Sequence, residues 1–524
     1  MKRVKKFTAV LLAAVLTVGL AGCSTAKKGN ASSPQGTSSA QRQASSNVKK
    51  AVDSTSSAAS SDYKVQTSGG FSLPYNTVTC FNPIRPTSQS NMNLWPLVYD
   101  CLAEPDSEYR AVMRLASSVR CSGTMVMVSI KSGVQFTDGS SLSADDVVYS
   151  YKMAMGSVLS PYHVRLSNIA KMTVSSASDL ALTIQLKTPD ILFANLLDVP
   201  IIKNGTGTTN DAVGTGRYSL RKDGVGATLV RNENWYGGKL PAFKTIPLVN
   251  TPNSNAIIPS LSIGEINYVY TDSGNGETTA TTNTTTAPVS LNRLLYIGVN
   301  ASRPHLNNAH FRRALSYSIN RRSLVSQIYS SRAQACILPF NPAWSALPAP
   351  KAQQFSDNFT QETAEMKHAG VTGTNVSMSL LVNADDSLRT AAARFVASCL
   401  VKTGVNIKVK AVTYGTYAAL IKQKNYDLYI GETQLAGDMD ISPLLASGGT
   451  ASYGLLTHSH TIAVFNDWRA GRKSINTVAS VFSKEMPFIP LCYRMGATSY
   501  TIGLNGVQAT NGDIFYRFED WTQQ

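Results

Sequence analysis

The stretch from Phe136 to Tyr151 reads F-T-D-G-S-S-L-S-A-D-D-V-V-Y-S-Y, and its residue types specify a turn followed by a helix. Asp138-Gly139 favours a tight turn. Ser143 can cap a helix whose first turn is acidic, which suits the positive end of the helix dipole. The apolar residues that follow on one face are Val147, Val148 and Tyr151. The stretch therefore indicates a fold and carries no chemistry of its own.

Six further segments match, in order, the pattern of a known family. They are Asn82-Pro83 leading to Leu97–Tyr99, Val213–Tyr218, Arg231–Gly237, Leu294–Asn300 followed by Phe311–Asn320, Asn425–Ile430, and Pro487–Leu491. Together with the first stretch they resemble the family 5 solute-binding proteins, the peptide- and nickel-binding receptors of ABC importers. The resemblance covers roughly residues 70–520. Arg217 and Asn320 depart from it, because the family usually has Pro and Asp there.

The resemblance implies an α/β, two-lobed, periplasmic-binding-protein-like type II fold with an additional smaller α+β domain. Lobe I would be discontinuous and contain residues 63–98, 208–292 and 487–524. The extra domain would span residues 99–207, and lobe II residues 293–486. Strands near Tyr296 and Cys492 would cross between the lobes as hinges. Closure of the lobes over a ligand is then the expected conformational switch.

The periodicity of apolar residues agrees with an α/β architecture. Apolar side chains recur at helical spacing from Ser387 to Lys402. Strict alternation from Val405 to Lys410 predicts a strand. We expect further helices over Tyr417–Lys424 and Tyr317–Tyr329, and a strand over Tyr426–Ile430.

The N-terminus has the features of a bacterial lipoprotein signal. A positively charged start precedes an apolar run, Phe7–Leu20, that is too short to span a membrane as a helix. The run ends in Leu20-Ala21-Gly22-Cys23, which resembles a lipobox. We therefore expect residues 1–22 to be a signal peptide and Cys23 to carry fatty acyl groups such as palmitate. That anchor would hold the mature chain on the extracytoplasmic face of the cell membrane.

Residues 23–62 are small and polar, which predicts a flexible tether, because such a segment cannot bury enough apolar surface to offset its ordering entropy. A second polar run, Asp272–Thr286, is expected to be a surface loop near a domain boundary. The net charge of +16 falls to +12 when the four positive side chains of residues 1–22 are removed. Attraction to anionic lipid headgroups or wall polymers, and simple solubility, both explain this charge.

Composition and cysteine usage are those of a soluble globular protein with two to four domains. The chain has 524 residues, of which 43% are hydrophobic and 15% charged. Six cysteines follow Cys23, at Cys80, Cys101, Cys121, Cys336, Cys399 and Cys492. An oxidising compartment permits disulfides, but the spacing does not define their pairing. Cys399 lies in a helical pattern and is expected to be buried apolar filler.

Two acidic residues are the leading candidate ligand contacts. In peptide-binding relatives, an Asp in a G-W-x-x-D segment holds the α-ammonium of the ligand, and the stretch that resembles it here is Gly431–Asp438. By that resemblance Asp438 matches best and Asp440 is second. A desolvated ammonium needs an opposed carboxylate, although a solvated loop Asp is the plainer interpretation. Leu435 replaces the expected Trp, which points to a smaller or different pocket.

Four aromatic residues are further candidate ligand contacts. Tyr296 and Tyr493 fall on the two expected hinge strands, where members of the family place pocket aromatics. Trp95 and Tyr453 are also candidates. For each of the four, packing in the core or at a rim is an equally open interpretation, because aromatic side chains are amphipathic.

Nickel, or another metal complex, is the nearest alternative cargo. His458 and His460 bring two imidazoles close together, and imidazole suits nickel and zinc. A solvated pair of histidines is the favoured interpretation, because no further ligands cluster nearby. A receptor of the same fold that serves as a solute sensor or adhesin, without transport, also remains open.

Catalytic and nucleic-acid functions are disfavoured. The trio Ser46-x-x-Lys49, Ser356–Asn358 and Lys402–Gly404 matches the signature of penicillin-recognising hydrolases, but Ser46 lies in the predicted tether. No phosphate-binding loop or nucleophile elbow is present, so the ATPase must be a separate chain. Positive charge without a recognition motif does not indicate nucleic acid. We expect a monomeric receptor, without catalysis, cofactor or bound metal, that works with an ABC permease and its ATPase subunits.

Overall fold

The structure is a computed structural model that describes residues 70–85, 87–210, 212–224, 226–251, 253–272, 283–347, 352–371, 376–454 and 459–524. The predicted signal peptide, Cys23 and the tether lie outside the described residues, as do His458 and most of the predicted loop Asp272–Thr286. In the described part of the chain, no helix combines the length and apolar character needed to span a bilayer.

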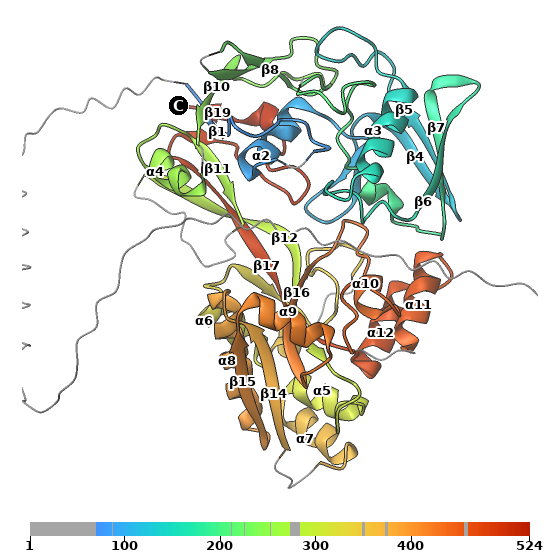
Figure 1. Ribbon diagram of the computed structural model, residues 1–524, viewed down its shortest axis with the longest axis vertical. Helices are drawn as coiled ribbons and strands as arrows, with labels where there is room; N and C mark the ends of the chain where they lie inside the picture. The colour runs from blue at the N-terminus through green and yellow to red at the C-terminus, as the bar shows by residue number, and fades with distance from the viewer. Residues whose placement is uncertain are drawn as a thin grey trace, which may run out of the picture. The chain divides into compact units, whose positions relative to one another are not determined.

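Two long strands, β12 (Thr284–Val299) and β17 (Ile489–Thr501), organise the fold. They pair with each other in antiparallel fashion, and Figure 1 shows them running side by side. One end of β17 also pairs with β11 (Tyr268–Thr271), and one end of β12 with β16 (Leu428–Gln434). The predicted loop up to Thr286 extended too far, because β12 begins at Thr284.

The remaining strands of this seven-stranded sheet are parallel to β16, apart from the short β13 (Ala333–Ala335), which pairs with β17. The sheet order is β11-β17-β12-β16-β14-β15. β14 (Val376–Asn383) pairs with β15 (Val405–Val412) and with β16. The helix α8 (Ser387–Val401) connects β14 to β15, so the predicted helix and the strand after it are confirmed.

The other predicted elements of this region differ from the structure in their bounds. α9 (Tyr414–Lys422) begins three residues before the predicted helix, and β16 begins two residues after the predicted strand. The helix predicted over Tyr317–Tyr329 is confirmed only from Arg321 to Ile328. α5 (Ala309–Tyr317) ends where that helix was to begin, and α6 (Arg321–Ile328) follows as a separate helix. The Asn320 side chain accepts a hydrogen bond from the Ser323 N–H and so starts α6 anew.

The first half of the chain, in its described residues, forms two four-stranded sheets. One has the order β1-β10-β9-β8, and the other the order β4-β5-β7-β6. Their strands are β1 (Leu73–Tyr75), β8 (Tyr218–Lys222), β9 (Ala227–Arg231), β10 (Thr245–Asn250), β4 (Ala116–Ser122), β5 (Met125–Ile130), β6 (Ile169–Ser175) and β7 (Ser178–Leu186). The remaining elements are α2 (Gln89–Val98), β2 (Ala103–Pro105), β3 (Ala111–Met113), α4 (Ile257–Ser262), α7 (Phe359–His368), α10 (Ser442–Leu445), α11 (His460–Arg469), α12 (Ile475–Glu485), β18 (Leu504–Asn505) and β19 (Thr522–Gln523).

The stretch Phe136–Tyr151 forms the predicted turn and the first part of α3 (Ala144–Gly156). Gly139 has a φ of 87°, a conformation that suits glycine, and the Ser143 N–H donates to the Asp146 carboxylate at 2.9 Å. The buried Tyr151 then anchors the helix on the β6 and β7 side of its sheet. The stretch therefore has the structural role that its sequence predicts.

Two large hydrophobic cores are built from different parts of the chain. We call one the N-terminal core; it runs from Phe71 to Tyr268 and adds four residues between Leu504 and Trp521. The other, the C-terminal core, contains buried residues from Leu294 to Tyr493 and also Tyr109. β17 contributes to the C-terminal core at one end, and its Tyr500 packs against the N-terminal core at the other. The paired β12 and β17 thus connect the two cores.

Candidate functional site

A cavity of about 990 Å³ is lined by residues of both cores. Trp95 and Leu196 come from the N-terminal core, and Leu435 from the C-terminal core. A shallower surface pocket of about 580 Å³ lies beside α8, and Arg394 is the one charged side chain in its lining. The larger cavity is the candidate binding site, because its volume and convergent polar groups are typical of ligand sites.

The lining of the larger cavity is rich in charge. It contains seven carboxylates and five guanidinium groups. The acids are Asp100, Glu104, Asp198, Asp272, Asp438, Asp440 and Asp513, and the bases are Arg114, Arg165, Arg217, Arg293 and Arg469. Acidic groups thus outnumber basic ones, which favours a ligand with a cationic group.

The two predicted ammonium ligands, Asp438 and Asp440, both line this cavity. They lie on the loop between β16 and α10, where Met439 adopts a left-handed φ of 54°. Asp438 is only 3% exposed, whereas the Asp440 side chain is 32% exposed. The Asp440 carboxylate accepts hydrogen bonds from the backbone N–H and the hydroxyl of Ser442, which fix its orientation at the start of α10.

Arg469, the last residue of α11, joins three carboxylates at this end of the cavity. Its Nη2 lies 2.5 Å from Asp190 Oδ2 and 2.9 Å from Asp438 Oδ2. Its Nη1 lies 3.7 Å from Asp440 Oδ1. One guanidinium therefore faces three acids, and we call these four residues the Arg469 cluster. With all three acids ionised, the Arg469 cluster has an excess of negative charge.

Burial shifts the pKa values of the acids in the Arg469 cluster. Desolvation raises the pKa of Asp190 to about 7; the Arg469 guanidinium opposes this effect, and the neighbouring Asp438 adds to it. Burial likewise raises the pKa of Asp438, again opposed by Arg469. Protons therefore bind this end of the cavity near neutral pH, so its charge depends on pH.

A second charged group lies on the side of the N-terminal core. Arg114 Nη2 lies 2.5 Å from Glu104 Oε1 and 3.5 Å from Asp513 Oδ2. Arg217, at the position where the family has Pro, is buried and lies 3.4 Å from the same Asp513 oxygen. Burial and the charge of Asp513 raise the pKa of Glu104 to about 7. The substitution at position 217 therefore brings a buried cation to the wall of the cavity.

A third charged group lies where Arg293 of β12 stands opposite Arg494 of β17. Arg293 of β12 pairs with Asp272 at 2.7 Å, and Arg494 of β17 pairs with Glu432 of β16 at 2.8 Å. Arg494 also reaches Asp272 at 3.3 Å. These ion pairs join β12, β16 and β17 next to the cavity, which Asp272 and Arg293 line.

The four predicted aromatic contacts have different positions. Trp95 lines the cavity, and its indole N–H donates to the Phe81 carbonyl at 3.1 Å. The other three are not among the cavity-lining residues. Tyr296 and Tyr493 are buried in the C-terminal core, where the Tyr493 hydroxyl donates to the Pro339 carbonyl at 2.9 Å. Tyr453 packs against the same core.

The basic residues of the site were missed at the sequence level. Arg469 and Asp190 are 279 residues apart, and no local pattern connects them. Arg165, which forms a bidentate pair with Asp198 at 2.6 and 2.8 Å, has no signature either. His460 begins α11 and is not among the residues that line the cavity, while its predicted partner His458 lies outside the described residues.

Comparisons with known proteins agree with this fold. Residues 111–452, more than half of the chain, match the family described as bacterial extracellular solute-binding proteins, family 5 Middle. The oligopeptide-binding protein AppA of Bacillus subtilis (strain 168) is 24% identical over 379 residues, which are 66% of this chain and 69% of AppA. Such relatives are solute-binding proteins, not enzymes.

Solved structures share the architecture. The periplasmic murein tripeptide-binding protein MppA, in an unliganded open form, has a TM-score of 0.72 at 16% identity and covers 86% of this chain and 96% of its own. NikA of Staphylococcus aureus, in complex with Ni(L-His)2, has a TM-score of 0.59 at 17% identity and covers 87% of this chain and 99% of its own. The fold is therefore the predicted two-lobed, type II periplasmic-binding-protein-like fold. The chain belongs to the family 5 extracellular solute-binding proteins, the substrate-binding proteins of peptide and nickel ABC importers.

Proposed function

We propose that this chain is a lipid-anchored receptor that captures a short peptide between its two lobes and delivers it to the permease of an ABC importer. The relative AppA is an oligopeptide-binding protein, which favours a peptide ligand. The proposal rests mainly on the Arg469 cluster, in which three carboxylates share one guanidinium at the end of a cavity of about 990 Å³.

The charge of the Arg469 cluster suits the α-ammonium group of a peptide. Arg469 neutralises one of the three acids, so a second cation would gain from the remaining negative charge. Asp440 is the accessible partner, because its side chain is 32% exposed. Asp438, which is 3% exposed, lies behind it and already pairs with Arg469. We assign Asp440 the direct contact and Asp438 the supporting charge.

Closure would bring the two lobes together over the peptide. We keep the lobe boundaries expected from the sequence: residues 63–98, 208–292 and 487–524 for lobe I, 99–207 for the extra domain and 293–486 for lobe II. The paired β12 and β17 are suited to be the hinge, because they connect the two cores. A ligand drives closure only by its greater affinity for the closed form.

The experiment that tests the ligand class compares a free peptide with its N-acetylated form. Peptides that copurify with the chain lacking residues 1–23 are identified by mass spectrometry and then titrated calorimetrically. We expect Asp440→Asn and Asp438→Asn to weaken binding of the free peptide by tenfold or more, corresponding to about 1.4 kcal/mol or more, while the acetylated peptide binds weakly to all forms.

The matched control is Asp467→Asn, which removes an exposed acid of α11 that pairs with Arg472 at 2.6 Å. It should leave the affinity for the free peptide unchanged. If the Asp438 and Asp440 variants weaken both peptides equally, the acids have only a structural role. If a stoichiometric metal copurifies in place of peptides, the nickel alternative replaces this proposal.

Membrane attachment is tested at Cys23, the residue that we propose to be acylated. Cys23→Ala should move the chain from the membrane fraction to the medium or periplasm and abolish labelling by radioactive palmitate. A variant that stays membrane-bound and labelled would contradict the proposed anchor.

A further inference from the structure

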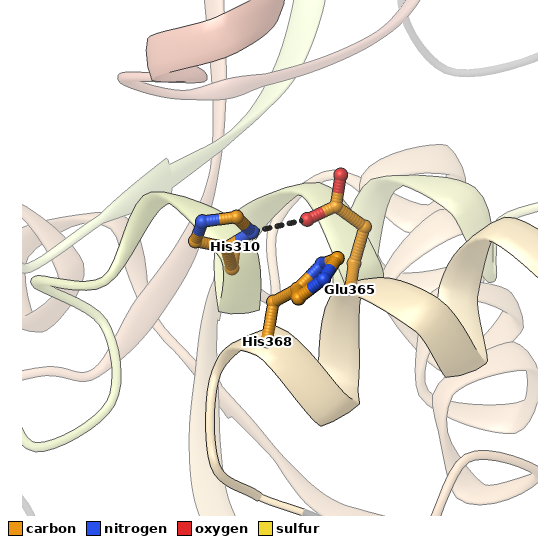
Figure 2. A group of neighbouring side chains, drawn as sticks. All are labelled: His310, Glu365 and His368. Atoms are coloured by element: carbon orange, nitrogen blue, oxygen red, sulfur yellow. Dashed lines mark hydrogen bonds and ion pairs between the residues drawn. The ribbon is translucent and has the colours of Figure 1, made fainter.

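Two histidines and a glutamate converge on α5 and α7, away from the cavity. His310 is the second residue of α5, and Glu365 and His368 lie three residues apart on α7. Figure 2 shows the two imidazoles and the carboxylate pointing toward one another. One potential ligand atom from each residue lies within 4.8 Å of the others. None of the three residues lines the cavity described above.

The two helices hold these side chains in place. The Asn308 side chain accepts a hydrogen bond from the His310 N–H at 2.8 Å, which fixes the first turn of α5. The side chain of Asn358 caps α7 in the same manner through the Gln361 N–H. Residues three apart on a helix share one face, so Glu365 and His368 both face α5, which packs against α7. Such positions on helices are preorganised for a ligand.

Arg313 orients the carboxylate of Glu365. Its Nε and Nη2 lie 2.8 Å from the two carboxylate oxygens, a bidentate arrangement, and Nη2 lies 2.7 Å from His310 Nδ1. His310 Nδ1 is also 2.7 Å from Glu365 Oε2. A carboxylate has about four lone-pair sites, so two bonds to Arg313 leave sites for another cation. Partners that hydrogen-bond a ligating carboxylate are usual around metal sites.

We propose that His310, Glu365 and His368 bind one divalent transition-metal ion of the zinc and nickel type. Two imidazoles and one carboxylate form a donor set that Zn²⁺ accepts, with water in the fourth position. Water has access, because the His310 side chain is 43% exposed. Mg²⁺ and Ca²⁺ are disfavoured, because they prefer oxygen ligands. The ion replaces the hydrogen bond between His310 and Glu365 and links α5 to α7.

The test is zinc binding by the full chain, purified in detergent without a histidine tag and treated with a chelator. Calorimetric titration with ZnCl₂ should give one tight equivalent per chain. His310→Ala and His368→Ala should each weaken that equivalent on the order of 100-fold or more, since even outer partners of a metal site are worth about 10–100-fold. Zinc should also raise the Tm of the unmodified chain and leave the Tm of the His310→Ala variant unchanged.

Matched controls separate this site from other histidines and from the cavity. His163→Ala and His460→Ala each remove a histidine outside the cluster and should keep the tight equivalent. Because both histidines of the site are partly exposed, their alanine variants should fold, which circular dichroism checks. The proposal is overturned if no zinc binds, or if His310→Ala and His368→Ala bind zinc as the unmodified chain does.

Discussion

At the residue scale, the Arg469 cluster brings buried charges together at the proposed binding site. Desolvation opposes the ionised forms of Asp190 and Asp438, while the nearby guanidinium favours them. Removing one partner of such a buried group is expected to be strongly destabilising, because it leaves an uncompensated charge. The changes to Asn proposed above should cost less, because Arg469 still faces the other two carboxylates.

The pH dependence of this cluster has opposite signs for stability and for affinity. A carboxyl whose folded pKa is raised to about 7 takes up its proton in the folded state while the unfolded chain is still ionised. Asp190 of this cluster and Glu104 of the second charged group are such carboxyls. The contribution of these groups to the free energy of unfolding therefore rises as the pH falls from about 8 toward 5. Binding of an ammonium group weakens over the same range, because the carboxylates lose their charge.

Thermal denaturation and peptide titration at several pH values check this prediction. The Tm should rise, and the dissociation constant should increase, as the pH falls through 7. Asp190→Asn should flatten the Tm profile. Carboxylates with a lowered pKa do not change the Tm in this pH range. The pKa of Asp138, for example, falls to about 2 because of its bonds with Lys203 and Ser140. The contribution of Asp138 to stability is therefore lost only at lower pH. An affinity that stays constant between pH 8 and 5 would contradict a contribution of the Asp190 charge to ammonium binding.

At the element scale, β12, one of the two strands that we propose as the hinge, contains two irregularities. Its pairing with β17 shifts register between Ser290 and Arg293 and again between Leu295 and Tyr296. Asn292, inside the first shift, has a φ of 51° and is fully buried. Its side-chain N–H groups donate to the carbonyls of Leu435 and Ala436 at 3.0 and 3.1 Å. One residue of β12 thus positions the start of the loop that carries Asp438 and Asp440.

Two substitutions at Asn292 distinguish the contribution of its side-chain hydrogen bonds to stability from that of its backbone conformation. Asn292→Gly keeps the left-handed conformation but removes the hydrogen bonds, and it should lower the free energy of unfolding by about 1–3 kcal/mol. Asn292→Ala should lower it by roughly 1 kcal/mol more, because alanine is strained at a positive φ. Urea denaturation measures both values. Equal stability of the two variants would show that the backbone conformation at this position relaxes.

Features that depend on neighbouring residues were predictable from the sequence. Features that depend on how separate helices and strands pair or end were not. The Ser143 cap of α3 and the helix α8 were predicted because each depends on neighbouring residues. The helix predicted over Tyr317–Tyr329 was placed to start too early, because apolar spacing continues across the break at Asn320. The resemblance placed Tyr296 on a hinge strand, but the face that a side chain takes depends on register, and a bulge adjoins Tyr296. No sequence pattern predicts either of the two register shifts in the pairing of β12 with β17.

At the scale of the whole molecule, several contacts cross between segments that belong to different predicted lobes or domains. The Asn195 side chain, in the predicted extra domain, donates to the Gly437 carbonyl of predicted lobe II at 3.0 Å. Its second hydrogen bond, to the Tyr109 carbonyl at 2.9 Å, stays within the predicted extra domain. A Cβ on Gly437 would lie 2.8 Å from the Asn195 carbonyl oxygen, so only glycine fits there without a shift. Asp190 reaches Arg469 in the same region. These contacts lie next to the cavity and would have to separate when the lobes open.

The closing equilibrium can therefore be tested without changing a residue that lines the cavity. Asn195→Ala removes the hydrogen bond to the Gly437 carbonyl, which we assign to the closed form. The fraction of the receptor in the closed, binding-competent form should therefore fall. A net loss of about 0.5–1.5 kcal/mol corresponds to a dissociation constant up to about tenfold larger. Small-angle scattering should still show compaction at saturating peptide, but at higher peptide concentration.

The matched control is Asn300→Ala, whose amide donates to the Lys424 and Tyr426 carbonyls within the C-terminal part of the chain. It should lower the Tm and leave peptide affinity unchanged, because those bonds do not cross between the predicted lobes. If Asn195→Ala behaves like this control, the Asn195–Gly437 contact persists when the receptor opens, and the hinge lies elsewhere. If only Asn195→Ala weakens binding, the contact belongs to the closed state, and part of the peptide affinity depends on closure.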